Sequence, residues 1–415
     1  MWQAILISRQ RLLNHCIPIT KLVVISLFID TRNETIIVVK TIKNQNYSMK
    51  VRLICIVIIA LASKQGFSQF RKYSNEFLNI GSGARGMGMG GAQIATTHDA
   101  TSGYWNPAAL IRVKDIPSIS LMHAEYFAGI GKYDFGAVAI PLADNKRTLG
   151  ISILRFAVDD IPNTLYLVEP DGSVNYGNIE TFSSADYAFI FSLAQKMKQV
   201  DEDHLMSFGG NVKIIHRKVG SFAKSWGFGI DASWSFRGPK WSLGAVLRDA
   251  TTTFNAWSFA FTEKEKEVLY LTNNDIPEKS TELTAPRLSL GAAYHFNLGK
   301  KLKLNTEVAM DVTFDGKRNT VISSDPISVD PRLGLELDVN NVFFLRGGVY
   351  NFQQGLKDGD TTNIKKVWIY QPCVGAGFKF GNVGIDYAFN NLANQSSPLY
   401  THIVSLRVDL RKKEK

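Results

Sequence analysis

The feature that most constrains the fold is an alternation of side-chain character with a period of two residues, repeated between turn residues from about residue 116 onward. In the segment 226–236, every even position is aromatic or aliphatic and every odd position is Gly, Ser or Asp. Successive side chains of a β-strand point to opposite faces, so such a segment forms a strand with one apolar and one polar face. The body of the chain is therefore predicted to be all-β.

Fourteen segments show this alternation, and many are nine or more residues long, the length that a tilted strand needs to cross a bilayer. They are 116–124, 132–142, 147–158, 184–197, 204–218, 226–236, 240–248, 285–297, 300–314, 330–338, 342–350, 370–380, 382–388 and 401–411.

The connections between these segments sort into two lengths. Those after the second, fourth, sixth, eighth, tenth and twelfth strands are short, whereas those after the third, seventh, ninth, eleventh and thirteenth are long, the longest being about 249–285. Outer-membrane barrels have short periplasmic turns and long outward loops. We predict a transmembrane antiparallel β-barrel of about fourteen strands in the cell outer membrane, with both termini in the periplasm.

Composition agrees with a strand-built membrane protein. After residue 70 no stretch is apolar for the ~20 residues of a spanning helix, and the mean hydropathy is −0.04. The net charge of +10 could suggest a nucleic-acid partner, but residues 1–68 hold nine Lys or Arg and two acids, leaving 38 bases against 35 acids. We therefore expect outer-membrane lipid as the surroundings and no nucleic-acid partner.

The amino-terminal part resembles an export signal. Residues 49–68 have a basic start, an apolar core of about ten residues and small residues near Ser68, as in a secretory signal peptide cleaved after Ser68. We predict an upstream extension at 1–48 without function, a hatch or plug segment at 69–115, a barrel at 116–411 and a charged tail at 412–415. A long bipartite signal that uses 17–29 is the competing interpretation.

The polar faces of the strands carry charges of both signs, which would point into the lumen of a closed barrel. They are expected to form a structural ion-pair network, with a polar passage for a small solute as the alternative. The residues are Asp186, Lys213, Arg217, Asp231, Arg248, Glu307, Asp311, Arg332, Glu336, Arg346, Asp386, Arg407 and Asp409.

No motif indicates catalysis, a cofactor or a metal, so we do not expect an enzyme. Gly81, Gly83 and Gly86 match G-x-G-x-x-G, but further glycines follow where a dinucleotide-binding helix should begin, which favours a Gly-rich coil packed in or beneath the barrel. Cys373, the one cysteine after residue 68, is expected to be a packing residue. Four acids beside turn residues are expected to be solvated loop acids: Asp99, Asp159, Asp160 and Asp325.

Aromatic residues in two predicted loops are candidates for contact with lipid or with a partner protein. They are Phe254, Trp257, Phe259 and Phe261 after the seventh strand, and Trp368 and Tyr370 after the eleventh.

Residues 73–110, YSNEFLNIGSGARGMGMGGAQIATTHDATSGYWNPAAL, resemble the entry segment of the PorV/PorQ family of Bacteroidetes outer-membrane proteins. The core of the likeness is Asp99 together with Asn106, Pro107 and Ala108. The same motif is similar to the amino-terminal hatch of the FadL long-chain fatty-acid transporters, whose fold is a fourteen-stranded barrel. Two departures are Ala109, where the hatch usually has Gly, and the terminal RKKEK in place of an aromatic residue.

Further stretches resemble the PorV branch, such as RDATTTFNAWSF and LRGGVYNFQQ. This resemblance implies a non-catalytic component of the type IX secretion system, with the translocon and the sorting domains of exported cargo as partners. The rival hypothesis is a FadL-like channel for hydrophobic small molecules, and a purely structural outer-membrane protein is a third.

Overall fold

The structure is a computed structural model that describes residues 23–29, 35–41, 73–113, 115–144, 146–169, 171–199, 204–276, 279–356, 366–392 and 400–410. The chain divides into two compact units, and the first contains an antiparallel hairpin of β1 (Val23–Ile29) and β2 (Thr35–Thr41), although no strand was predicted there. The predicted signal peptide and the charged tail lie outside the described residues.

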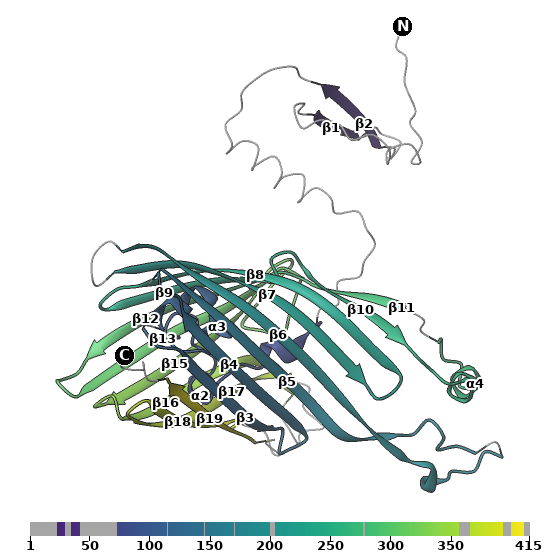
Figure 1. Cartoon of the computed structure of the whole chain (residues 1–415). Helices are drawn as coiled ribbons and strands as arrows, with labels where there is room; N and C mark the ends of the chain where they lie inside the picture. Colours follow the sequence, from purple (N-terminus) through teal and green to yellow (C-terminus); the bar gives the residue numbers. More distant parts are fainter. Residues whose placement is uncertain are drawn as a thin grey trace. The chain divides into compact units, whose positions relative to one another are not determined.

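The second unit contains an antiparallel sheet that closes on itself (Figure 1). Closure comes from the pairing of the last strand with the first, in which Leu406 lies opposite Leu121. A closed barrel leaves no unpaired strand edge, as the hydrocarbon layer of a membrane requires. The strands are β3 (Ser118–Tyr126), β4 (Gly131–Pro141), β5 (Arg147–Asn163), β6 (Glu180–Gln199), β7 (Leu205–Val219), β8 (Ala223–Arg237), β9 (Trp241–Arg248), β10 (Thr253–Phe259), β11 (Lys279–Thr284), β12 (Arg287–Asn297), β13 (Leu302–Thr313), β14 (Ile322–Ser323), β15 (Ser328–Val339), β16 (Phe343–Leu356), β17 (Lys366–Phe380), β18 (Val383–Asn390) and β19 (Thr401–Asp409).

Two of the wall strands are interrupted. β8 pairs with β10 along its first half and with β9 along its second half, so β9 and β10 act as one wall strand. β11 and β12 likewise act as one wall strand, because β11 pairs with β10 and β12 pairs with β9. With β14 only a short addition to β15, the wall has fourteen strands, which confirms the predicted number and type.

The predicted long loop at 249–285 is wrong at both ends, because β10 and β11 extend the wall into it. The break between β9 and β10 hid this extension. It falls at 249–252, where Asp249 and Thr252 have positive φ angles. Inside the barrel, Lys213 Nζ lies 2.7 Å from Asp231 and also contacts Asp249, which anchors the break. The remaining connection contains the helix α4 (Glu263–Leu271).

The outer surface carries the apolar side chains. On β8 the outward apolar residues run from Phe236 to Trp226, which spans ~25 Å for a strand rising ~3.3 Å per residue at ~40° tilt. This height equals the apolar band of outer-membrane barrels, ~25 Å. Outward aromatic residues flank it, with Trp241, Tyr294, Phe343 and Phe380 at one margin and Tyr187, Trp226, Trp368 and Tyr387 at the other. The chain is therefore a transmembrane β-barrel of the outer-membrane type.

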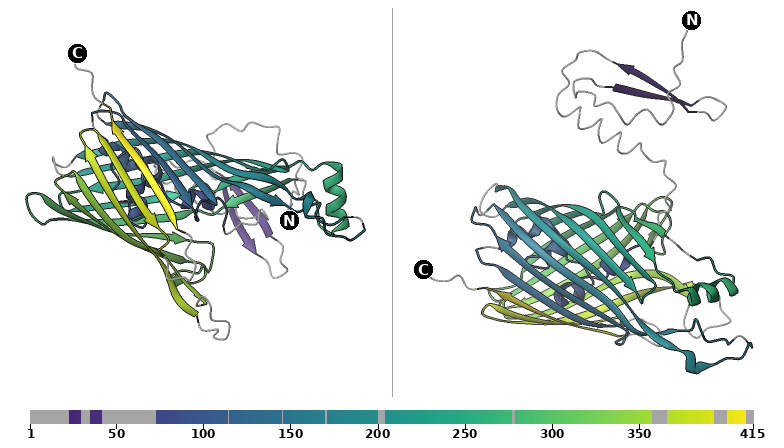
Figure 2. Two further views of the ribbon diagram at one scale, coloured as in Figure 1. Left: turned by 90° about the horizontal axis from the view of Figure 1, so that it is seen from below. Right: turned by 45° about the vertical axis from the view of Figure 1, so that its right-hand side comes forward.

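The two ends of the barrel differ. We call one the short-turn end, formed by the connections 142–146, 200–204, 238–240, 298–301, 340–342 and 381–382, and the other the long-loop end, formed mainly by 164–179, 260–278, 314–327, 357–365 and 391–400. Figure 2 shows α4 and the hairpin of β5 and β6 projecting at the long-loop end, while β19 ends at the opposite end of the barrel.

The hatch, residues 73–113, lies inside the barrel (Figures 1 and 2). It consists of short helical turns joined by coil: η1 (Glu76–Asn79), α2 (Ala84–Gly88), α3 (Ser102–Trp105) and η2 (Pro107–Arg112). None of the described helices is long and apolar enough to cross a membrane. The predicted Gly-rich coil inside the barrel is confirmed.

Candidate functional site

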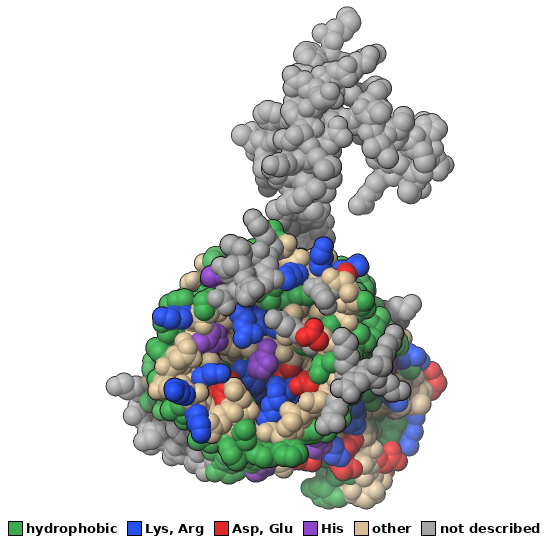
Figure 3. Space-filling model, turned by 60° about the vertical axis from the view of Figure 1, so that its left-hand side comes forward, with side chains coloured by type: hydrophobic (Ala, Val, Ile, Leu, Met, Phe, Trp, Pro, Cys, Tyr) green, Lys and Arg blue, Asp and Glu red, His purple; other side chains and the backbone are tan. Residues whose placement is uncertain are grey.

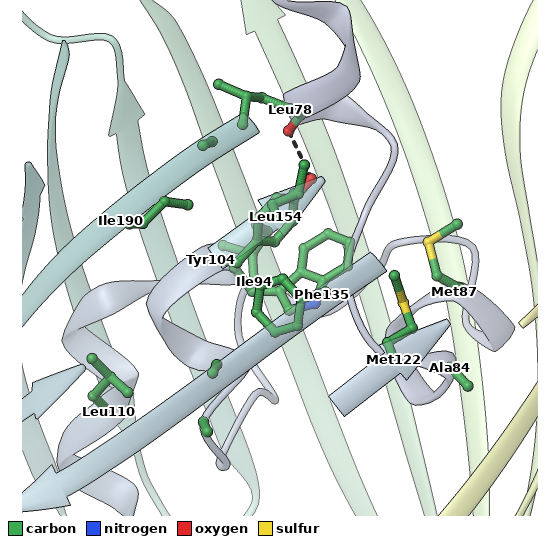
Figure 4. Close-up of a cluster of buried hydrophobic side chains, with 14 of the residues drawn as sticks. Leu78, Ala84, Met87, Ile94, Tyr104, Leu110, Met122, Phe135, Leu154 and Ile190 are labelled. Atoms are coloured by element: carbon green, nitrogen blue, oxygen red, sulfur yellow. Dashed lines mark hydrogen bonds between the residues drawn. The ribbon is translucent and has the colours of Figure 1, made fainter. Parts of the chain in front are cut away.

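One side of the hatch packs against the apolar inner wall formed by β3–β6. Tyr104 of α3 lies beside Phe135 of β4, with ring centroids 6.2 Å apart, and its hydroxyl donates to the Leu78 carbonyl at 2.7 Å (Figure 4). Trp105 is 2% exposed and its indole donates to the Ser82 carbonyl. This cluster is a hydrophobic core that lies inside the lumen, where a pore would have water.

The opposite side of the hatch is fixed by buried ion pairs. Both oxygens of Glu336 on β15 accept from Arg85 of α2 at 2.8 Å. Glu336 also accepts from Arg346 on β16 at 2.7 Å, and Arg346 donates in turn to Asp386 on β18. Charge-assisted, bidentate hydrogen bonds of this kind are the strong class. The predicted ion-pair network is therefore present, and it holds the hatch to the wall.

Other wall charges bind the hatch backbone directly. Glu307 of β13 accepts from the backbone N–H of Ala95 at 2.7 Å and of Thr96 at 3.0 Å. Arg248 of β9 donates to the carbonyls of Tyr104 and Trp105. These contacts satisfy backbone groups of an irregular segment that has few internal hydrogen bonds of its own.

Inward glycines let the hatch backbone touch the wall. A Cβ added at Gly209 would lie 2.4 Å from the Ala108 nitrogen, and one at Gly348 would lie 2.3 Å from the Met89 carbonyl carbon. Strand glycines commonly mark a close approach of another backbone segment. The sequence alone does not reveal this role, because a glycine breaks no period-two pattern. The other members of this set are Gly244, Gly291, Gly334 and Gly375.

The structure brings the predicted hatch motif to the inner wall. Asn106 Oδ1 accepts from the Ala108 nitrogen, and its Nδ2 donates to the Ile94 and Trp234 carbonyls. Pro107 occupies the first turn of η2, where its missing N–H has no cost. The Ala108 carbonyl accepts from Ser207 of β7 at 2.8 Å. The Asn-Pro-Ala motif therefore connects the hatch to the wall through hydrogen bonds.

Asp99 is not the solvated loop acid that we predicted. It is 7% exposed, accepts from the Thr101 nitrogen and hydroxyl, and lies 3.7 Å from Arg407 on β19. Burial is the largest single influence and opposes ionisation, but the charge of Arg407, the hydrogen bond from Thr101 and the other nearby positive charges together hold the pKa of the Asp99 carboxyl below its ordinary value. An acid beside turn residues is usually expected at the protein surface, because most turns lie there. The turn that contains Asp99 lies inside the barrel, so the acid is buried.

The cavities found between hatch and wall are small. Three of them measure about 10, 10 and 30 Å³, and a single water needs ~10–15 Å³. A larger cavity, about 500 Å³, lies at the outer face of the wall between Leu121, Ile153 and Val404. The described part of the lumen is plugged.

Five of the six predicted partner-binding aromatics lie on strands instead of loops, whereas Phe261 lies in the connection 260–278. Phe254, Trp257 and Phe259 belong to β10, while Trp368 and Tyr370 belong to β17. Phe254, Trp368 and Tyr370 are 44%, 45% and 42% exposed on the outer face. Trp257 and Phe259 alternate with Phe254 and face inward, and the Trp257 indole donates to Glu282 at 2.9 Å. Their role in partner binding remains a prediction.

Other exposed apolar residues occur at the long-loop end, and none of them is among the residues predicted from the sequence. Tyr176 in the connection 164–179 is 75% exposed, and Tyr270 and Leu271 at the end of α4 are 78% and 74% exposed. Lys264 of α4 lies 4.4 Å above the ring of Tyr166, which joins the two connections. We call Tyr176, Tyr270 and Leu271 the loop patch.

The geometry confirms the predicted packing role of Cys373. Cys373 is 2% exposed and its thiol contacts the Gly88 carbonyl, so it is a packing residue. Among the described residues, no group of three or more His, Cys, Asp or Glu side chains is placed to hold a metal ion.

No protein-family model and no curated protein matches the chain. Among solved structures, it is similar to a Pseudomonas aeruginosa FadL homologue at 11% identity and a TM-score of 0.46, over 80% of this chain and 98% of the other. It is also similar to the CymD monoaromatic hydrocarbon channel (12%, 0.48, 81% and 99%) and to the Ralstonia pickettii toluene transporter TbuX (12%, 0.47, 80% and 99%). At these identities and TM-scores, the likeness carries no argument about function.

Proposed function

We propose that the protein is a plugged outer-membrane barrel that binds partner proteins at its long-loop end. The observation that carries this proposal is the loop patch, three large apolar side chains that are exposed in two connections of the long-loop end. Large apolar side chains exposed to water are characteristic of surfaces that bind another protein. A lumen filled by a core and by buried ion pairs is suited to a rigid platform.

The sequence resemblance to the PorV branch names the partners that we expect. They are the translocon of type IX secretion and the sorting domains of its cargo. In this role the barrel presents the loop patch outward and the hatch keeps the wall rigid, so no chemistry is required of the chain.

Substitution of the loop patch tests this role. The variant Tyr176→Ser/Tyr270→Ser/Leu271→Ser should insert normally, yet lose co-purification with the translocon and surface display of sorting-domain cargo. The matched control is Val321→Ser, since Val321 is 43% exposed in a different long connection. Normal display by the triple variant would contradict the proposal.

The second candidate is a channel for hydrophobic small molecules, the property named for the neighbouring hydrocarbon channels. One observation favours it. The outer cavity of about 500 Å³ and an inner cavity of about 10 Å³ share Leu121, Met122 and Phe135, so they lie on opposite sides of one wall section. A small movement of β3 would join them.

A cross-link separates the two candidates. The Ala84 nitrogen of the hatch lies 3.0 Å from Ser405 Oγ of β19, so Ala84→Cys/Ser405→Cys is expected to form a disulfide that fixes the hatch. If the protein is a platform for partner proteins, this variant should co-purify with them under both oxidising and reducing conditions. A channel that needs hatch movement loses uptake of labelled fatty acid or toluene when oxidised and regains it on reduction.

A further inference from the structure

The short-turn end of the barrel is strongly basic. Its turns and strand ends carry nine basic residues: Lys146, Arg147, Lys196, Arg237, Lys240, Lys300, Lys301, Lys303 and Lys379. The acids described at this end are Asp115, Asp144, Asp338 and Asp409, and the last three already accept from local donors. Asp144 accepts from Arg147, Asp338 from the Asn341 nitrogen and Asp409 from Ser118. Leaving Lys196 aside, the eight other bases outnumber these four acids, so this end carries a net positive charge among the described residues.

Arg112 carries this charge into the lumen. Its guanidinium is 8% exposed and donates to the carbonyls of Ala95 and Thr97 and to Ser235 Oγ, so no carboxylate touches it in the described structure. Burial, and next the charge of Arg237, lower the pKa of the Arg112 guanidinium to about 9. A buried cation held only by dipoles is in an unfavourable site that a nearby anion would stabilise.

Two neighbouring strands extend the basic site to the mouth of the lumen. Arg237 lies two residues beyond Ser235 on the same face of β8, and no hydrogen bond or ion pair to its side chain is found within the described part of the chain. Across the sheet, Ser242 lies opposite Arg237 and binds His295 at 2.9 Å. Figure 3 shows Lys, Arg and His side chains around the hollow in this face of the molecule, with Asp and Glu side chains among them.

We propose that the short-turn end is a docking site for an acidic peptide segment of a water-soluble protein. Because the site is positively charged, charge complementarity favours a negatively charged occupant. Arg112 and His295 lie on the inner side of the wall, where lipid head groups outside the barrel do not reach. The basic residues extend over several turns, from 142–146 to 381–382, so one small anion cannot span them, whereas an extended chain of carboxylates can.

The test uses the full mature protein in detergent micelles with a fluorescent hexaglutamate peptide as the probe. The variant Arg237→Gln/Lys379→Gln removes two side chains for which the described structure shows no hydrogen bond or ion pair to the hatch. It should weaken peptide binding at least tenfold, and the affinity of the unchanged protein should fall steeply with salt. The matched control is Lys224→Gln/Lys366→Gln, which removes two basic residues near the long-loop end and should leave binding unchanged.

Three outcomes would overturn the proposal. They are equal loss in the control variant, equal binding of a hexalysine peptide, and complete displacement by millimolar inorganic phosphate, which would indicate a site for a free anion. Asp201, Glu202 and Asp203 of the chain lie outside the described residues. If they occupy the site themselves, the unchanged protein fails to bind the peptide while Asp201→Asn/Glu202→Gln/Asp203→Asn binds it, which also overturns an external partner. These measurements do not involve the loop patch, so this proposal and the proposed function can fail independently of each other.

Discussion

At the scale of single residues, the interior of this barrel is held by a few polar contacts that cannot be replaced singly. Glu336 is the clearest case, because it is 3% exposed and accepts from two arginines that come from different segments. Removing one member of a buried ion-pair network leaves the others charged and unpaired.

Glu336→Gln should therefore lower the free energy of unfolding by ~3–5 kcal/mol, because Arg85 loses its carboxylate while remaining buried. Urea unfolding in detergent, followed by tryptophan fluorescence, measures the change. Asp171→Asn, at an exposed acid of the connection 164–179, is the control and should change stability by ~0–1 kcal/mol. Equal effects of the two substitutions would show that the network does not carry the stability.

The inward glycines give a second prediction at this scale. Gly209→Ala should destabilise the protein by ~1–3 kcal/mol, because its Cβ would overlap the hatch backbone at Ala108. Gly347→Ala is the matched control, since a Cβ there meets only the Cys373 carbonyl oxygen at 4.0 Å. The same unfolding measurement applies, and an effect at Gly347 as large as that at Gly209 would contradict the close approach.

At the scale of elements, the strands were predictable and the hatch geometry was not. Period-two alternation arises because each strand has one apolar face and one polar face. All fourteen wall strands could therefore be predicted from it, at least in part. It failed at β10 and β11 because the break at 249–252 interrupts the pattern and hid a continuing strand. The hatch has no period, since its residues are buried on all sides. Its motif could be recognised, but the burial of Asp99 depends on the surrounding wall.

The apolar band is an element-scale feature that tryptophan fluorescence can test. In single-tryptophan variants, Trp226 and Trp241, each 55% exposed on the outer face, should be quenched by lipids brominated near the head group, because interfacial tryptophans lie at that depth. Trp105 is buried in the hatch and serves as the control that should not be quenched. Quenching of Trp105 as strong as that of Trp226 would contradict a hatch enclosed by the wall.

At the scale of the whole molecule, closure of the barrel depends on the seam between β19 and β3, which joins the two ends of the wall in sequence. The register places Leu121 opposite Leu406 on the outer face, where substitution does not disturb the hatch. Since the described strands leave no other edge, this pairing completes the barrel.

The double variant Leu121→Cys/Leu406→Cys should therefore form a disulfide on mild oxidation, with nearly complete yield in the folded protein and little in the urea-unfolded chain. Residues opposite each other on paired strands have Cβ atoms ~4.5–5.5 Å apart, close to the separation that a disulfide requires. Leu121→Cys/Leu345→Cys is the control, because Leu345 lies on β16, which does not pair with β3. Electrophoresis with and without reductant, after boiling, distinguishes the linked from the free chain. A control that cross-links as well as the seam pair would mean that the chain is collapsed instead of closed, and the plugged-barrel account would fail with it.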